Sequence, residues 1–141
     1  MTVAIDQTSE RATGSLTRDA AAVLAEAHHY AVSATPAEMA KTMQAVFGQN
    51  LTALMLGVEH PKTAGKWARG QAPHRENLSR LRDTFQITVF LERMTTRQTV
   101  QAWFMGMNPD LGDRAPALVL ADDPLQMPQL LRVARSFVAR G

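Results

Sequence analysis

The stretch LTALMLGVEHPKTAGKWARGQAPHRENLSRL, residues 51–81, decides the fold that we expect for this chain. Its first apolar residues recur at i, i+3, i+4 and i+7 and therefore form one stripe along a helix: Leu51, Leu54, Met55 and Val58. Gly57 is the kind of residue that ends a helix in a turn. The stretch is therefore predicted to begin with a short amphipathic helix that stops at Gly57.

A second helix is predicted directly after this turn. Pro61 suits the first helical position, because proline lacks the N–H that would be unpaired there, and Gly70 suits the residue just past the end. The helix between them reads PKTAGKWAR, with Ala64 and Trp67 spaced to face the core. Its remaining polar side chains are left for solvent: Lys62, Thr63, Lys66 and Arg69.

Two short helices joined by a tight turn are typical of helix-turn-helix DNA-binding proteins, in which the second helix enters the major groove. Lysine, threonine and arginine can donate to base edges and phosphates there. The predicted DNA contacts on this helix are Lys62, Thr63, Lys66 and Arg69, and those on the next helix are Arg75, Arg80 and Arg82. The alternative is an ordinary amphipathic helix with a solvated basic side.

The same stretch resembles helix-turn-helix domains of the Xre (lambda-repressor-like) type, which carry a phrase close to LGV…TVxxWxxGxxxP…LxxL. The matching residues are Leu56, Gly57, Val58, Thr63, Trp67, Gly70, Pro73, Leu78 and Leu81. Gly65 departs from the pattern, since these domains usually have a larger polar residue there. A glycine inside a helix costs roughly 1 kcal/mol relative to alanine. Either another group packs closely against Gly65, or this helix is less firm than in the family.

The composition is that of an ordinary folded protein, with 45% hydrophobic and 20% charged residues among 141. The net charge of +2 is unevenly distributed, because residues 60–97 hold eight basic and three acidic side chains. This excess lies where a phosphate backbone would require it. The absence of cysteine excludes disulfides and thiolate metal sites. Without a membrane-length apolar run or a secretory signal in residues 1–14, we expect a cytoplasmic protein.

The segment before residue 51 is predicted to hold a loose tail and two helices. Residues 1–14 are polar without periodicity, and a helical pattern begins at Ser15. Thr35, Pro36 and Glu38 form a capping box with proline at the first helical position, which is a strong start signal. The helix that follows ends at Gly48 and carries one apolar stripe: Met39, Met43, Val46 and Phe47.

Two further helices are expected between residues 74 and 106. Leu78, Leu81 and Phe85 face inward on the first. It continues through ITVFLERM, residues 87–94, because a strand there would have no partner. Thr96 caps the second, whose apolar residues are Val100, Trp103 and Phe104. Since no series of alternating strands is present, the predicted fold class is all-α.

From Val100 onward, short apolar helices alternate with strong helix breakers. Asn108-Pro109 and Gly112 fall in one loop, Pro116 opens a helix of one or two turns, and Asp122-Asp123-Pro124 precede the last helix. Pro128 cannot lie deep in that helix, so its regular part should begin near this proline. Its inward residues are then Leu130, Leu131, Ala134, Phe137 and Val138.

This last third resembles the toxin-binding domain of the Xre/MbcA/ParS antitoxin family, whose relatives read roughly W…NPxLGGxxPLxLL before a final helix. The matching residues are Trp103, Asn108, Pro109, Leu111, Gly112, Pro116, Leu118 and Leu120. Asp113 replaces the second glycine of the pattern. The order of the two parts, with the helix-turn-helix first, is also that of the family.

The resemblance implies an antitoxin of a type II toxin–antitoxin pair. Such antitoxins neutralise a cognate toxin, usually a RES-domain protein that consumes NAD, by covering its NAD pocket with their C-terminal region, and many repress their own operon. Carried onto this sequence, the toxin-binding candidates are Arg132, Arg135, Ser136, Arg140 and Gly141. The alternative is that NPDLGDRAP is only a stable loop and the last helix only a core or dimer helix.

No recognisable catalytic pattern is present. The sequence lacks a Gly-rich phosphate loop and an H-E-x-x-H motif, and no Ser or Thr has a histidine partner in a known arrangement. We therefore expect neither an enzyme, nor a cofactor, nor a metal site.

These features predict an all-α protein with an N-terminal tail and helix (residues 1–34), a helix-turn-helix domain (35–95) and a small helical toxin-binding domain (96–141). The expected function is a homodimeric antitoxin that binds operator DNA and its toxin. One alternative is a stand-alone or phage-type transcriptional repressor whose C-terminal helices only dimerise. Another is a protein-interaction module whose helix-turn-helix no longer binds DNA.

Overall fold

The computed structural model describes residues 20–140, apart from the side chain of Pro124. This part of the chain is all-helical, as predicted, and its only pairing of extended residues is the isolated bridge between Asn108 and Arg114. The predicted tail, the helix start at Ser15 and Gly141 lie outside the described residues. None of the helices within 20–140 is both long and apolar enough to cross a membrane.

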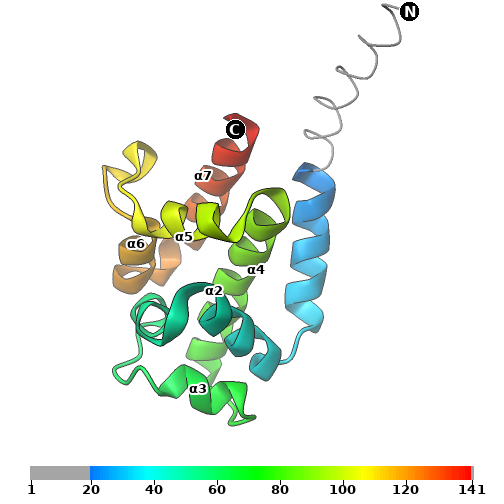
Figure 1. Ribbon diagram of the computed structural model, residues 1–141, viewed down its shortest axis with the longest axis vertical. Coiled ribbons are helices and arrows are strands. Elements are labelled where there is room, and N and C mark those ends of the chain that lie inside the picture. Colours follow the sequence, from blue (N-terminus) through cyan, green and yellow to red (C-terminus); the bar gives the residue numbers. More distant parts are fainter. Residues whose placement is uncertain (1–19, 141) are drawn as a thin grey trace, which may run out of the picture.

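The first described helix covers residues 20–33. The elements that follow are α2 (Pro36–Leu56), α3 (Thr63–Ala68), α4 (Arg75–Met94), α5 (Arg97–Met105), η1 (Pro109–Leu111), α6 (Pro116–Asp122), η2 (Pro124–Gln126) and α7 (Met127–Arg140). Along the longest axis of the molecule, α3 lies at one end and the end of α7 at the other, with α4 between them (Figure 1). The elements that the sequence singles out for DNA and for a toxin therefore lie far apart.

Helix α2 is bent at Gly48, where the sequence predicts a helix end. Gly48 has φ 79° and ψ 172°, a conformation essentially restricted to glycine. Side chains donate hydrogen bonds to three carbonyls around the bend. Thr52 Oγ1 donates to the carbonyls of Gly48 (2.6 Å) and Met43 (3.2 Å), and Gln101 Nε2 donates to that of Val46 (2.6 Å). These hydrogen bonds stabilise the bend at Gly48.

The predicted helix starts at Thr35 and Thr96 are confirmed. Thr35 Oγ1 accepts from the Glu38 N–H (3.1 Å) while the Glu38 carboxylate accepts from the Thr35 N–H (3.2 Å), which completes the capping box. Thr96 Oγ1 accepts from the Thr99 N–H (3.1 Å). Each cap contributes typically about 1 kcal/mol because it satisfies an N–H that has no partner within the helix.

Helix α4 is the centre of a single hydrophobic core. Its buried residues pack between the first described helix, α2, α5 and α7, and the ITVFLERM segment is helical as predicted. The largest fully buried side chains come from α2, α4, α5, α6 and α7: Met39, Met43, Met55, Leu56, Leu81, Phe85, Ile87, Phe90, Leu91, Phe104, Leu120 and Leu130. Burial of such side chains stabilises the fold by about 1.5 to 3 kcal/mol each.

The C-terminal helices belong to this same core. Phe104 of α5 packs edge-to-face against Phe47 of α2, with ring centroids 4.9 Å apart, and Trp103 packs against Phe137 of α7. The boundary expected at residue 96 falls in the short connection between α4 and α5. The helices on either side of it are packed together in one core.

Candidate functional site

The turn between α2 and α3 is built around Gly57. This residue has φ 66° and ψ 27°, in the left-handed region, and its N–H donates to the Leu54 carbonyl (3.2 Å). The Val58 N–H donates to the Ala53 carbonyl (3.1 Å), which satisfies a second carbonyl at the helix end. The predicted helix stop at Gly57 is therefore confirmed.

Helix α3 begins two residues later than the sequence predicts. Pro61 lies in a β-turn in which the Thr63 N–H donates to the His60 carbonyl (3.0 Å), and the first helical bond runs from Lys66 to Lys62 (3.1 Å). Proline fixes a φ that suits the second position of such a turn as well as the first position of a helix. The helix consequently has six residues, Thr63–Ala68, and not the expected nine or so.

The orientation of α3 agrees with the prediction. Ala64 is fully buried and Trp67 is only 3% exposed. We call the opposite side the basic side of α3; it consists of Lys62, Lys66 and Arg69, which are exposed, and Thr63, which is half-buried. The inward alanine and tryptophan hold this side toward solvent.

Gly70 ends α3 in the way that the sequence predicts. Its φ is 108°, its N–H donates to the Trp67 carbonyl (2.9 Å), and the Gln71 N–H donates to the Lys66 carbonyl (3.0 Å). These two bonds are those of a Schellman motif, which satisfies the last carbonyls of a helix. A short helix such as α3 depends on ends of this kind, because it makes few internal hydrogen bonds.

The three arginines of α4 that the sequence predicts as phosphate contacts divide into one exposed side chain and two that bind within the fold. Arg75, at the start of α4, is exposed and adjacent to the α3 connection. Arg80, predicted as a phosphate contact, instead directs its guanidinium inward, where it donates to the carbonyls of Leu56, Leu120 and Ala121. Burial lowers the pKa of Arg80. Arg80 thus links the end of α2 to the end of α6, and we remove it from the DNA contacts.

Arg82, the third arginine predicted to contact phosphate, is also engaged within the protein. Its Nε donates to the Ala31 carbonyl at 3.0 Å, which joins α4 to the first described helix. This carbonyl lies in the last turn of the helix, where helical partners are missing. Arg82 therefore acts as a helix cap and not as a free basic group.

The loop between α5 and α6 has the conformation that its helix breakers suggest. The Asn108 side chain accepts from the Asp110 N–H (2.9 Å), Pro109 opens η1, and Gly112 has φ 64°. Asp113 also has a positive φ, 63°. Aspartate tolerates this conformation better than most residues, although glycine adopts it at lower cost.

The candidate toxin-binding residues lie on the outer side of α7, the helix that packs inward through Leu130, Val133 and Ala134. We call this outer side the C-terminal surface; its residues are Arg132, Arg135, Ser136 and Arg140, all exposed. Gly141 lies outside the described residues. Arg140 pairs with Asp110 at 3.1 Å, so the end of α7 contacts the loop before α6.

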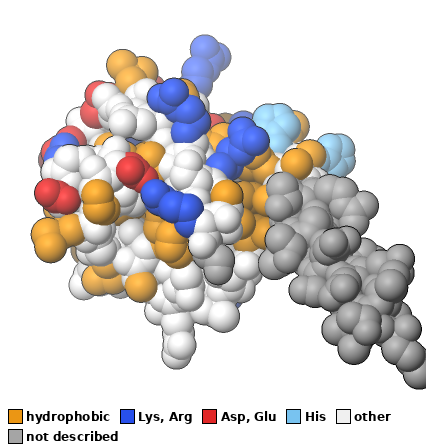
Figure 2. Space-filling model, turned by 90° about the horizontal axis from the view of Figure 1, so that it is seen from above, with side chains coloured by type: hydrophobic (Ala, Val, Ile, Leu, Met, Phe, Trp, Pro, Cys, Tyr) orange, Lys and Arg blue, Asp and Glu red, His pale blue; other side chains and the backbone are white. Residues whose placement is uncertain are grey.

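The end of the molecule that carries the C-terminal surface is chemically mixed. Viewed from this end, Lys and Arg side chains lie next to hydrophobic ones, with Asp and Glu toward one edge (Figure 2). Met105 and Met107, which flank the loop contacted by Arg140, are 64% and 82% exposed. Large exposed apolar side chains beside charged groups are suitable for protein recognition.

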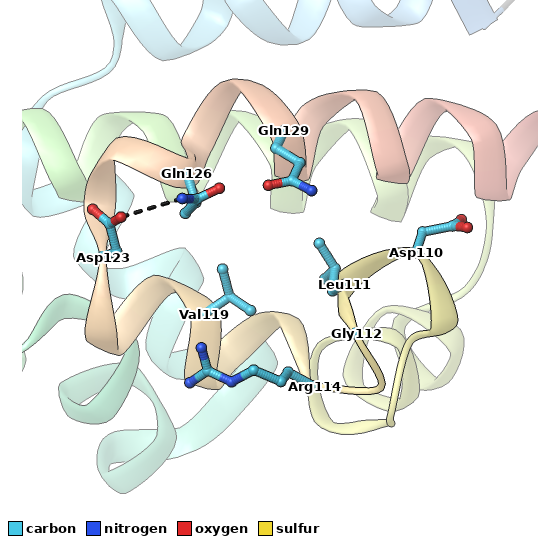
Figure 3. Close-up of a pocket in the computed structure, with 8 residues that line it drawn as sticks. All are labelled: Asp110, Leu111, Gly112, Arg114, Val119, Asp123, Gln126 and Gln129. Carbon is cyan, nitrogen blue, oxygen red and sulfur yellow. Dashed lines mark hydrogen bonds between the residues drawn. The ribbon is translucent and has the colours of Figure 1, made fainter.

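A hollow of about 260 Å³ lies between this loop, α6 and the start of α7. Gln126 and Gln129 extend into it from one side, opposite Val119 and Leu111 (Figure 3). Its charged groups are already paired within the protein, Arg114 with Asp122 and Asp110 with Arg140. The Asp123 carboxylate accepts from the Leu125 N–H and from Gln126. The charged side chains that line this hollow therefore have partners within the protein.

A second hollow, of about 280 Å³, lies between α4 and α7 and is mainly apolar. Asp83 lies at its edge. Burial raises the pKa of Asp83, and the nearby charges of Arg82 and His28 oppose this shift. Residues 20–140 contain no group of three or more potential metal ligands placed together.

Two residues near α3 were not predicted from the sequence. The side chains of Gln44 and Gln49, on either side of the α2 bend, end close to Gly65 of α3. A glutamine has no distinctive spacing signal, and their meeting point depends on the bend at Gly48. The sequence signal for this contact is Gly65, which departs from the helix-turn-helix pattern.

Comparisons of the chain with protein-family models, with curated proteins and with solved structures find no match.

Proposed function

We propose that this chain is a cytoplasmic DNA-binding antitoxin that represses its own operon as a homodimer and neutralises a cognate toxin, of the RES-domain type, through its C-terminal region. The observation that carries the proposal is the basic side of α3, which Ala64 and Trp67 hold toward solvent next to the Gly57 turn. In this proposal the second part of α2, the turn and α3 act as a helix-turn-helix.

The DNA half of the proposal is supported by the charges around α3. The helix itself carries no acidic residue, and Lys62, Lys66 and Arg69 are exposed on the side away from the core. Arg75 adds a further exposed charge at the start of α4. Neutralisation of DNA phosphates releases condensed counterions, so three or four such groups would give affinity that falls steeply with salt. Lys62 and Thr63 lie at the start of α3, where base edges are usually read.

The toxin half is supported by the C-terminal surface and its surroundings. Three arginines project from α7 while the same helix is anchored by Leu130, Val133 and Ala134, so the surface is rigid and exposed. Met105 and Met107, which precede the loop that Arg140 contacts through Asp110, add exposed apolar side chains. Arginine and methionine are enriched at protein interfaces.

The two proposed surfaces lie at opposite ends of the long axis of the molecule (Figure 1). One molecule could therefore bind DNA through α3 and a toxin through α7 without a clash between the two partners. This arrangement suits an autorepressor that remains on its operator while it holds the toxin.

Lys66→Ala tests the DNA half. We expect weaker binding to the DNA upstream of the coding sequence in a gel-shift assay, with an unchanged melting temperature, because Lys66 is exposed. The wild-type affinity should also decrease as salt increases. Absence of binding by the wild type at low salt, alone and together with the product of the adjacent gene, would contradict the repressor function.

The second candidate function is a stand-alone repressor, and one observation favours it. Helices α5 to α7 share the core of α2 and α4, so they could be present only to complete the DNA-binding fold or to dimerise. A repressor of this kind needs no partner protein at the C-terminal surface. Substitution of Arg132 and Arg135 by alanine distinguishes the two, because only an antitoxin should lose protection against a toxin while DNA binding is retained.

A further inference from the structure

Gly65, the residue that departs from the helix-turn-helix pattern, lies where three polar side chains meet. The nearest atoms to the position of its missing Cβ are Arg69 Nη1 (3.4 Å), Gln44 Nε2 (3.6 Å) and Gln49 Nε2 (3.9 Å). These atoms come from α3, from the first part of α2 and from the residue after the Gly48 bend. The three side chains cover Gly65, which is buried although it lies near the surface.

All three atoms are nitrogens that carry hydrogens. A guanidinium and two amide NH₂ groups direct donors toward this point, and the hydrogen bonds found in residues 20–140 include none among these three side chains. Arg69 and Gln49 are exposed, and Gln44 is half-buried. The ion pairs found in residues 20–140 involve other arginines, which leaves the Arg69 charge without an acidic partner there. A cluster of donors with a positive charge suits an anion with several oxygens.

The cluster shares Arg69 with the basic side of α3. Gly65 and Arg69 are four residues apart and therefore share one side of the helix, which adjoins Lys66 and faces the bend of α2. The major groove is about as wide as a helix with its side chains, roughly 12 Å. When the basic side enters the groove, the adjoining side comes against the sugar–phosphate backbone at the groove edge.

We propose that Gln44, Gln49 and Arg69 together bind one phosphate of the DNA backbone, and that Gly65 is the residue that allows them to meet. This inference rests on the proposed DNA binding and extends it by a contact that does not depend on base sequence. Two glycines make the site: Gly48 bends α2 so that Gln44 and Gln49 converge, and Gly65 adds no side chain beneath them.

The size of the residue at position 65 provides a matched pair of variants. An alanine Cβ would make only ordinary contacts of 3.4 to 3.9 Å, so Gly65→Ala should keep the cluster in place. Gly65→Gln carries a longer side chain into the space that the three nitrogens occupy and should displace them. Both substitutions raise helix propensity, by up to about 1 kcal/mol, so neither should unfold α3.

The test measures binding by fluorescence anisotropy to two labelled duplexes: the DNA upstream of the coding sequence, and a shuffled duplex of the same composition. Gly65→Gln, Gln44→Ala and Gln49→Ala should each weaken binding to both duplexes by the same factor, on the order of ten- to a hundredfold, as expected for loss of a hydrogen bond to a charged group. Gly65→Ala should bind like the wild type. Arg69→Ala should weaken binding and also reduce the salt slope by about one, whereas the neutral glutamine variants should leave the slope unchanged.

Melting temperatures of the four neutral-residue variants should stay close to or above that of the wild type, which separates a lost contact from a lost fold. Equal binding by the wild type, Gly65→Gln and the glutamine variants would overturn the phosphate site and leave the proposed DNA binding intact. Weaker binding to the upstream duplex alone would overturn it too, because it would indicate contacts with bases. If the wild type binds neither duplex, the phosphate site and the proposed function both fail.

Discussion

The guanidinium of Arg80 occupies the space that a side chain at position 57 would need. The turn that begins the connection to α3 is thus packed directly against a charged group, and this group also donates to the carbonyls of Leu120 and Ala121 at the end of α6. Gly57 is required here for two separate reasons, its left-handed backbone and its lack of a Cβ.

Gly57→Ala is expected to destabilise the protein by more than the backbone alone explains. A residue other than glycine pays about 1 to 2 kcal/mol in the left-handed region, and displacement of the packed guanidinium should add about 1 to 3 kcal/mol. Gly112→Ala is the matched control, because Gly112 has a similar φ of 64° but no atom near its missing Cβ. Urea unfolding measures both variants; equal losses would show that Arg80 moves aside at no cost.

Arg80→Met should destabilise the fold without altering the electrostatics of DNA binding. The substitution keeps much of the aliphatic side chain but leaves the carbonyls of Leu56, Leu120 and Ala121 without their donor, a loss of about 1 to 3 kcal/mol. The salt slope of DNA binding should stay at the wild-type value. Arg75→Met is the comparison, since it should leave stability unchanged and reduce the slope by about one. A reduced slope for Arg80→Met would return Arg80 to the phosphate contacts.

Trp67→Ala should unfold or strongly destabilise the protein, because the indole is 3% exposed and packs in the core. The expected loss is about 3 to 5 kcal/mol, the usual range for truncation of a buried aromatic residue. DNA binding should disappear together with the fold. A variant that melts like the wild type but fails to bind DNA would place Trp67 on the basic side of α3, contrary to the structure.

The stability of the protein should depend on Asp83 in a defined direction. Burial raises the pKa of this carboxyl in the folded state, so its charged form is unfavourable there and its protonated form is favoured. Stability from this group is fully present below the unfolded pKa and is lost as pH rises through the higher folded pKa. Asp83→Asn should therefore melt at a higher temperature than the wild type at neutral pH, and the difference should shrink in acid. A constant difference across pH would exclude titration of Asp83 as its cause.

Local signals explain how much of this fold could be predicted. Gly57, Gly70 and the Thr35 cap act within one helical turn, so their effects can be read from neighbouring residues, and each is found where expected. At Gly48, where a helix end is predicted, α2 bends and then continues to Leu56. Pro61 shows the limit of such signals, because the same fixed φ serves a turn and a helix start. In this chain Pro61 lies in the turn closed by the hydrogen bond from the Thr63 N–H to the His60 carbonyl.

The parts of the candidate site that could not be predicted depend on contacts between distant residues. Arg80 reaches carbonyls 24, 40 and 41 residues away, and no periodicity distinguishes such an arginine from an exposed one. Gln44 and Gln49 meet Gly65 only because α2 bends between them. Charge counting correctly located a basic segment but could not separate the arginines that bind within the fold from those left for a partner.

Deletion of residues 139–141 separates the two leading functions. Helix α7 is held by Leu130, Val133 and Ala134 in the core, while Arg140 is exposed and its ion pair with Asp110 lies at the surface, where such pairs contribute little. The shortened protein should therefore melt within a few degrees of the wild type and bind the upstream DNA equally well. Protection against the toxin encoded by the adjacent gene should be lost in co-expression, because these residues would no longer enter the partner's cleft.

Asp110→Asn is the control, since it breaks the ion pair but keeps Arg140 and should still protect. Growth with the shortened protein as good as with the full chain would contradict blocking by the C-terminal region, and weakened DNA binding would favour a stand-alone repressor.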